Sequence, residues 1–246
     1  MRRIAAAFFS LAAFLVIWKL VTVVGGYPVY ILPAPEVVAE RGIRAIGSGI
    51  LWEHSAVTLL ETVLGFALGA ATAILTGIAL GKSLLIERVL SPYIVAAQAV
   101  PILALAPLLD IWFGGGLLAR VVICALIVFF PITIATMVGI RATDPLLTEM
   151  LRSLGATNAQ RTRLLEVPSA LPILFGGLRV GVTLAVIGAV VAEWAGASVG
   201  LGVLINIANQ GLFDTPLMFV ALATLAIIGL VFYGLVVLVE RRLVSR

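Results

Sequence analysis

The chain has 246 residues, of which 62% are hydrophobic and only 11% are charged. Soluble domains carry roughly 25% charged residues, so this composition indicates an integral membrane protein and excludes a soluble globular domain. The net charge of +4 would suit nucleic acid or anionic lipid, and the positions of the charges decide between them. The single cysteine, Cys124, lies in an apolar run and excludes a disulfide within the chain.

Six segments are long and apolar enough to cross a membrane, which takes about 20 residues of helix. The sequence therefore predicts an all-α integral membrane protein with one transmembrane domain over residues 1–246. The expected spans are 4–24, 57–81, 89–112, 117–139, 173–195 and 217–239.

The first span, 4–24, also fits a signal peptide, because Met-Arg-Arg precedes its apolar run. No Ala-x-Ala cleavage site follows, which favours a retained span, although the alternative stays open. Residues 33–53 are expected to include a helix on the outer surface. His54, the only histidine, is expected to be solvated or interfacial, since the three or four ligands of a metal site do not converge in the sequence.

The second span carries small residues at helical spacing. Gly65 with Gly69, and Gly77 with Gly81, each form G-x-x-x-G, which predicts close packing against a helix of this chain or of a second copy. The string GIALGKS at 77–83 is one residue too short for a phosphate-binding loop, so nucleotide binding is not expected. Lys82 is instead expected to anchor the cytoplasmic end of the span.

Polar residues inside spans are candidates for the translocation pathway, because burying them in lipid is costly. Gln98 lies mid-span near Pro101, and a hydrogen bond between helices is an equally good explanation of it. Glu193 and Trp194 lie at the outer end of the fifth span. Arg179, at its inner end, is expected to snorkel to the interface, and Glu61 is expected to do the same at the outer end of the second span.

The loop 140–172 is polar but not irregular. Asp144-Pro145 predicts a helix start, and Gly155 predicts its end in a left-handed conformation. Thr157 and Gln160 predict a capping box that begins a second short helix. The first helix has an apolar face and a polar one, made of Leu146, Leu147, Met150, Leu151 and Leu154 and of Thr148, Glu149, Arg152 and Ser153 respectively.

Pro168 and Pro172 are expected to end the second short helix before the fifth span. Two short amphipathic helices of this kind suit insertion into a groove on another protein. They suit an interfacial pair resting on lipid headgroups equally well. The residues alone do not separate these two interpretations.

The Gly-rich segment 195–213 carries Asn206, Asn209 and Gln210 and is expected outside, where it would contact a binding protein or form a partly re-entrant gate. Lysine and arginine set the orientation. With both termini in the cytoplasm, the outside segments hold Arg41, Arg44 and Arg120, and Lys19 and Arg179 lie within spans. The inside segments hold Arg2, Arg3, Lys82, Arg88, Arg141, Arg152, Arg161, Arg163, Arg241, Arg242 and Arg246. The positive balance is thus a topology signal, and no nucleic-acid partner is expected.

The loop also resembles a known family. Glu149, Gly155 and the pair Val167-Pro168 are similar to the EAA loop of ABC-importer permeases, although Met150 and Leu151 replace its two alanines. Four further strings resemble the nitrate/sulfonate/taurine-type branch and occur in its order, so the resemblance covers nearly the whole chain. They are ILPAPEVV (31–38), PILALAPLLDIWFGGG (101–116), LEVPSALP (165–172) and VVAEWAGASVGLGVLI (190–205).

The resemblance implies a type I importer permease in the bacterial plasma (inner) membrane. Its partners would be a separate ATP-binding subunit, an extracytoplasmic substrate-binding protein, a second permease copy (usually identical in this branch) and membrane lipid. ATP and Mg would be bound by the partner ATPase, so no cofactor is expected in this chain. The residues expected to couple to the ATPase are Glu149, Leu151, Arg152, Leu154, Gly155 and Arg161, and for the two arginines a headgroup contact is the alternative.

The strings AEWAGASVGLG (192–202) and INIANQGLFDTPLMF (205–219) are most similar to permeases for thiamine-precursor pyrimidines. Permeases for riboflavin, sulfonate, taurine and nitrate are close neighbours, and these substrates stay open. A membrane-embedded enzyme is the remote alternative. No G-x-S-x-G string accompanies a serine, and ATPase activity that depends on a separate subunit would separate the two classes.

Overall fold

The computed structural model describes residues 2–211 and 213–244, and within them every regular element is helical, which confirms the all-α prediction. The elements are α1 (Arg2–Gly25), α2 (Pro35–Gly47), α3 (Ile50–Lys82), α4 (Leu84–Ala99), α5 (Ile102–Trp112), α6 (Gly116–Arg141), α7 (Pro145–Ser153), α8 (Asn158–Arg161), the π-helical turn η1 (Thr162–Glu166), α9 (Val167–Gly196), α10 (Leu201–Asn206), the π-helical turn η2 (Ile207–Gly211) and α11 (Thr215–Val244).

The chain divides into two compact units, the first made of Met1–Val57 with Val199–Ala226. In this unit the indole of Trp18 stacks on Phe219, with ring centroids 5.5 Å apart, and its Nε1 donates a hydrogen bond to the Pro33 carbonyl at 3.1 Å. Arg41 of α2 forms an ion pair with Asp214 at 2.7 Å. These contacts hold α1 and α2 against the start of α11. The helix α2 lies within the segment 33–53, where a helix is predicted.

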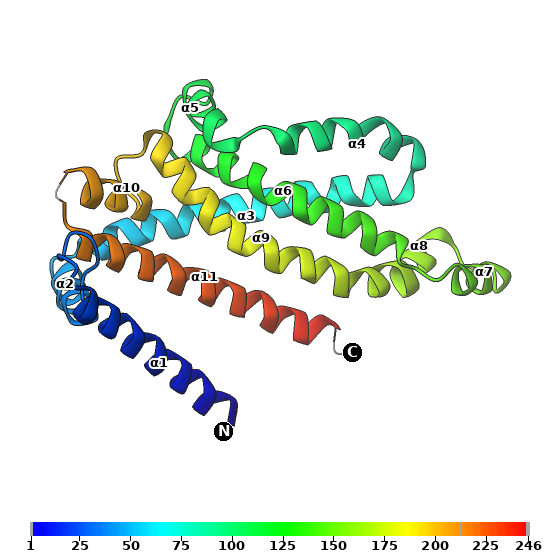
Figure 1. Cartoon of the computed structure of the whole chain (residues 1–246). Helices are drawn as coiled ribbons and strands as arrows, with labels where there is room; N and C mark the ends of the chain where they lie inside the picture. The colour runs from blue at the N-terminus through cyan, green and yellow to red at the C-terminus, as the bar shows by residue number, and fades with distance from the viewer. Residues whose placement is uncertain (1, 212, 245–246) are drawn as a thin grey trace. The chain divides into compact units, whose positions relative to one another are not determined.

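The second unit is made of Thr58–Ser198 with Ile227–Arg246, and α6 and α9 run side by side in it (Figure 1). The glycines of α3 face α6: a Cβ at Gly69 would lie 2.7 Å from the Ala125 carbonyl oxygen, and one at Gly77 would lie 2.7 Å from the Thr133 carbonyl oxygen. Glycine therefore allows the two backbones to approach closely. The neighbour that the G-x-x-x-G spacing predicts is a helix of the same chain.

Four helical stretches of the described chain are long and apolar enough to cross a membrane: Ile50–Lys82, Gly116–Arg141, Asn158–Gly196 and Thr215–Val244. The predicted span 89–112 differs, because it is divided into α4 and α5, which are bent by 98°. Pro101 has no N–H and disfavours helical backbone at the residue before it, and Val100 is accordingly extended (φ −77°, ψ 123°). In α1 the apolar stretch is Phe9–Gly25, and the number of spans stays a prediction.

The fifth predicted span begins earlier than expected. We expected Pro168 and Pro172 to end the short helix that starts at Asn158, and this prediction is wrong, since α8, η1 and α9 follow one another without a break. Pro168 lies in the first turn of α9, directly after the π-helical turn. The missing N–H of proline is least costly at such a position.

Candidate functional site

The segment 144–161 has the local structure that its sequence predicts. The Asp144 side chain accepts a hydrogen bond from the Leu146 amide at 2.8 Å and so caps α7. Gly155 has φ +76°, and the Ala156 amide donates to the Leu151 carbonyl at 3.0 Å, which closes the helix end. Thr157 and Gln160 form the predicted capping box at the start of α8.

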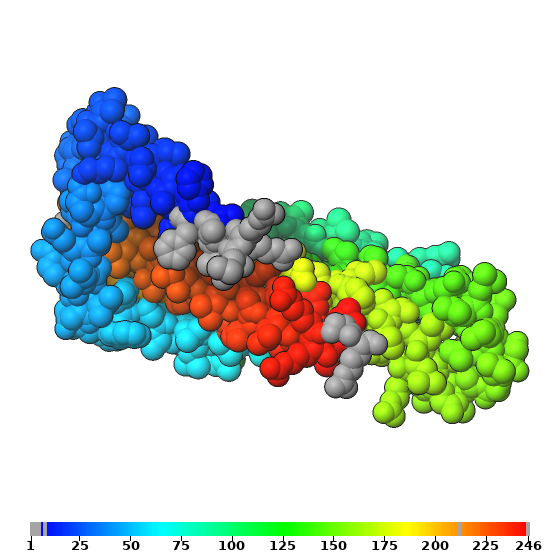
Figure 2. Space-filling view, turned by 90° about the horizontal axis from the view of Figure 1, so that it is seen from below, coloured from blue at the N-terminus to red at the C-terminus, as the bar shows by residue number. Residues whose placement is uncertain are grey.

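The apolar face of α7 is exposed in this chain. Leu146 and Leu154 are each 74% exposed, and Met150 is 51% exposed, although these are residues that normally lie in a core. Glu149 and Arg152 are also exposed, and Leu151 is half-buried. In Figure 2 the segment 140–166 forms the green end of the second unit. The structure thus brings five of the six predicted coupling residues together on and just after α7, and Arg161 follows on α8.

Ion pairs fix this segment to the ends of α3 and α4. Arg141, at the end of α6, binds both carboxylate oxygens of Glu87 at 2.8 and 2.7 Å and donates to the Leu80 carbonyl at 2.8 Å. Lys82 pairs with Glu166 of η1 at 3.0 Å. A polar cavity of about 410 Å³ lies between these elements, and Arg152 and Arg161 are among its lining residues. Lys82, which is predicted to anchor the cytoplasmic end of its span, thus has a carboxylate partner that the sequence does not indicate.

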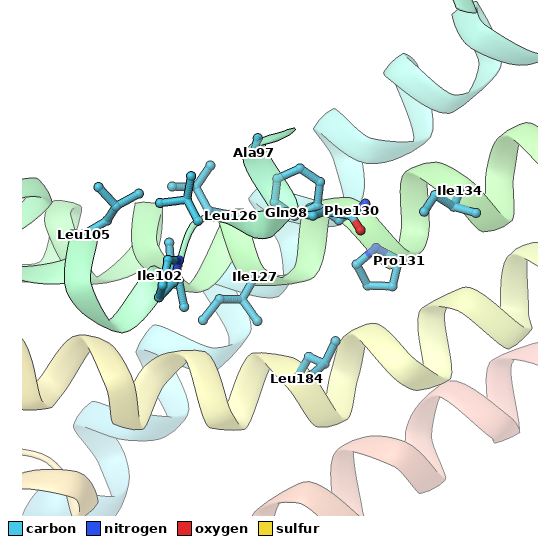
Figure 3. A pocket seen from close by; sticks show the side chains of 12 residues that line it. Ala97, Gln98, Ile102, Leu105, Leu126, Ile127, Phe130, Pro131, Ile134 and Leu184 are labelled. Atoms are coloured by element: carbon cyan, nitrogen blue, oxygen red, sulfur yellow. The ribbon is translucent and has the colours of Figure 1, made fainter. Parts of the chain in front are cut away.

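A second cavity lies at the break between α4 and α5 (Figure 3). Its volume is about 640 Å³, and its walls are apolar apart from the amide of Gln98. The twelve lining residues are Ala97, Gln98, Val100, Pro101, Ile102, Leu105, Leu126, Ile127, Phe130, Pro131, Ile134 and Leu184, none of which is charged. The cavity therefore brings Gln98 and Pro101 together but contains neither Glu193 nor Trp194, the other two pathway candidates.

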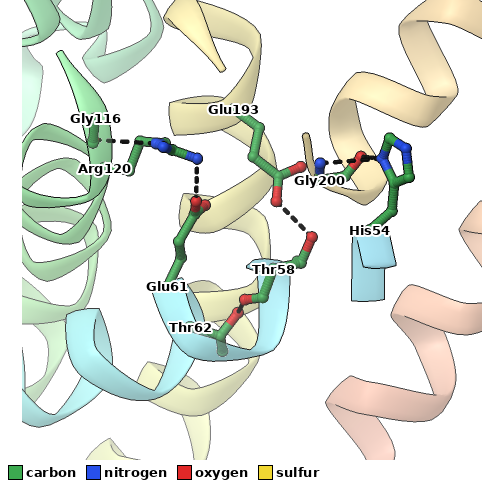
Figure 4. A network of polar contacts seen from close by, with 8 residues as sticks. All are labelled: His54, Thr58, Glu61, Thr62, Gly116, Arg120, Glu193 and Gly200. Atoms are coloured by element: carbon green, nitrogen blue, oxygen red, sulfur yellow. Dashed lines mark hydrogen bonds and ion pairs between the residues drawn. The ribbon is translucent and has the colours of Figure 1, made fainter. Parts of the chain in front are cut away.

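Glu193 belongs instead to a buried polar cluster formed by α3, α6 and α9 (Figure 4). Its side chain is 1% exposed and accepts a hydrogen bond from Thr58. In the same cluster Glu61 is fully buried and forms an ion pair with Arg120 at 2.5 Å. Trp194, one residue further along α9, is 47% exposed.

Four residues differ from their expected solvation. Glu61, which we expected to snorkel to the interface, is fully buried because Arg120 pairs with it inside the protein. Arg120, which we expected in an outer loop, pairs with Glu61 across 59 residues of sequence, and no local pattern encodes such a pair. Arg179, which we expected to reach the lipid interface, forms an ion pair with Glu240 of α11. The prediction that His54 is solvated or interfacial is wrong: the residue is 7% exposed, and its Nδ1 lies 3.0 Å from the Gly200 amide within the first unit.

Comparison with known proteins gives consistent results. Residues 65–245 match the family described as the binding-protein-dependent transport system inner membrane component. The riboflavin transport system permease protein RibX of Chloroflexus aurantiacus is 48% identical over 96% of this chain and 87% of its own length. The formylaminopyrimidine transport permease protein ThiX of Halalkalibacterium halodurans is 36% identical over 88% of this chain and 85% of its own.

The fold agrees with a solved structure as well. An amino acid ABC transporter crystallised with histidines has a TM-score of 0.65 and 24% sequence identity, covering 81% of this chain and 97% of that one. The resemblance found in the sequence is thus confirmed, and so is the type I importer fold. The chain belongs to the family of binding-protein-dependent transport system inner membrane components, and it is a multi-pass permease subunit of an ABC importer and not an enzyme.

Proposed function

We propose that this permease passes an uncharged, flat heteroaromatic solute, with riboflavin the favoured substrate, and that the segment 140–166 couples it to a separate ATP-binding subunit. Both termini would lie in the cytoplasm, where the excess of lysine and arginine is placed. A substrate-binding protein outside and a second copy of this chain would complete the importer. The ATP and Mg would be held by the ATP-binding subunit.

Two features support the coupling role. The apolar face of α7 is exposed, and ion pairs hold the rest of the segment to α3 and α4. The leucines of α7 are exposed, and an amphipathic helix of this kind is stabilised when its apolar face enters a groove on a partner. The base of the segment is held by the pairs Arg141–Glu87 and Lys82–Glu166, so a force on α7 is passed to α3 and α4. Glu149, Arg152 and Arg161 would make polar contacts at the rim.

The substrate class is proposed from the cavity at the α4–α5 break, which no charged side chain lines. A sulfonate, taurine or nitrate ion buried there would lose its hydration without a cationic partner, because no charged side chain lines the cavity. A heteroaromatic ring can bury its faces against Ile127 and Phe130 and leave one amide, that of Gln98, for a ring carbonyl or N–H. The geometry thus favours a vitamin over an inorganic or sulfonate anion.

Riboflavin and a thiamine-precursor pyrimidine both satisfy this requirement, although the sequence strings favour the pyrimidine. The 48% identity with a permease named for riboflavin, against 36% with one named for formylaminopyrimidine, supports the flavin. The pyrimidine remains the second candidate, since the two relatives share the uncharged, heteroaromatic character of their named substrates.

Competition in uptake tests this proposal. Cells that express the permease with its ATP-binding subunit and binding protein are given radiolabelled riboflavin, formylaminopyrimidine or taurine in parallel. Riboflavin uptake is also measured with each of the three unlabelled compounds in excess. We expect ATP-dependent uptake that riboflavin abolishes and taurine leaves unchanged. Uptake of labelled taurine would overturn the assignment of the substrate class, and uptake of the pyrimidine alone would select the second candidate.

A further inference from the structure

One carboxylate oxygen in the buried polar cluster has no hydrogen-bond donor. Glu61 is fully buried, and its Oε1 accepts from Arg120 Nη1 at 2.5 Å. Its Oε2 is also buried and accepts no hydrogen bond from the described residues. The carboxyl of Glu193 lies within interaction range of Glu61 (Figure 4). An ionised carboxylate oxygen left in this state is costly, because burial removes the water that would otherwise bind it.

Charged and titratable groups reach this cluster from each neighbouring helix. Glu61 comes from α3, Arg120 and the Cys124 thiol come from α6, and Glu193 comes from α9. Beside the end of α9, Asp110 of α5 lies against Gly196 and accepts the Gly115 amide on its backbone carbonyl at 2.7 Å. The acidic groups of the cluster are Glu61 and Glu193, and the cation beside them is the guanidinium of Arg120.

One proton on the two carboxyls supplies a hydrogen-bond donor at the buried oxygen and also removes one of the two negative charges. Two carboxylates that face each other repel, whereas a carboxylic acid donates one O–H bond to its neighbour. With one proton on the pair, Arg120 balances the remaining negative charge. A metal ion would need a third ligand, and the part of the chain that the structure describes contains no cluster of three acidic, histidine or cysteine side chains.

We propose that Glu61 and Glu193 bind one proton between them, which makes this cluster a proton-binding site that holds α3, α6 and α9 together. Loss of the proton places a second negative charge beside Arg120 in a buried site, and the two carboxyls then repel. The packing of the three helices depends on pH for this reason. The site is separate from the uncharged cavity and from the segment 140–166, so it does not rest on their proposed roles.

Infrared difference spectroscopy tests the proposal directly. The complete transporter in lipid nanodiscs is titrated from acidic to alkaline pH, and the C=O stretch of a protonated carboxylic acid is followed in H₂O and D₂O. We expect such a band at neutral pH, which disappears at alkaline pH in the unmodified protein and is missing in E61Q. The matched control is E53Q, which changes an exposed glutamate on the same helix and should keep the band. An unmodified protein without the band at neutral pH would overturn the proposal.

Thermal unfolding gives a second measurement. A folded state that binds one proton more than the unfolded state loses a factor of about ten in its folding equilibrium for each pH unit of increase. We expect this loss in the unmodified transporter as the pH rises from the usual carboxyl range to the alkaline pH at which the infrared band disappears, with no further loss from this site above that pH. We expect E61Q to remove the loss, because the amide resembles the protonated acid. Equal pH dependence in E61Q and in the unmodified protein contradicts the proposal, as does a stability that follows Na⁺ at constant pH.

Discussion

Substitution of Gly69 by alanine tests whether backbone contact between α3 and α6 organises the second unit. The new Cβ would lie 2.7 Å from the Ala125 carbonyl oxygen and 3.0 Å from Val128 Cβ, where an ordinary contact begins at 3.4 Å. The helices must therefore separate by about 0.7 Å, since neither contact is the flexible end of a side chain. Overpacking of this kind costs about 1–3 kcal/mol.

Alanine also raises helix propensity by about 1 kcal/mol, so the control must receive the same benefit. Gly176 of α9 is suitable, because a Cβ there meets nothing within 4 Å. In a thermal unfolding assay of the purified transporter, we expect Gly69→Ala to have a midpoint about 2–12 °C below that of Gly176→Ala, at roughly 2–4 °C per kcal/mol for a chain of this size. Equal midpoints would refute the argument that contact with α6 requires glycine here.

Three further predictions concern other parts of the chain. Gly155→Ala should reduce the ATP-binding subunit that co-purifies with the permease, because φ +76° costs a Cβ residue roughly 1–2 kcal/mol, whereas Gly155→Asn should lose less; equal losses would exclude backbone conformation as the cause. Gln98→Leu should raise the KM for uptake severalfold at unchanged expression, since it removes the cavity's amide but little of its volume, and an unchanged KM would remove Gln98 from the pathway. The hydrogen bond from Lys19 holds the pKa of Glu36 below its usual range, so the stabilisation is complete above the usual carboxyl pKa and is lost as the pH falls through the lowered value. Lys19→Gln should return the pKa of Glu36 to its usual range in an NMR titration, and no change would contradict this contact.

The sequence predicts most of what depends on neighbouring residues. The caps at Asp144 and Thr157 and the left-handed Gly155 are encoded within a few positions of where they act, and all three are present. The bend at Pro101 also has a local signal, but hydropathy averaged over a span does not register it, so a continuous helix was expected.

Contacts between distant segments could not be predicted. The pair Glu61–Arg120 depends on the packing of α3 against α6, which a single sequence does not give. The burial of His54 likewise depends on a glycine backbone 146 residues away. Apolar composition identifies which helices are suited to lipid, but it does not say which of their few charges find a partner inside the protein.

The uninterrupted helical stretch Asn158–Gly196 has a mechanical consequence. Its 39 residues extend about 58 Å at 1.5 Å per residue, so a tilt of about 5° at the α8 end displaces the opposite end by about 5 Å. Had Pro168 ended the helix, as its sequence suggested, a flexible joint would absorb that rotation. Because the helix has no break between these residues, a small rotation beside Thr157 becomes a displacement about as large as a helical turn at Gly196.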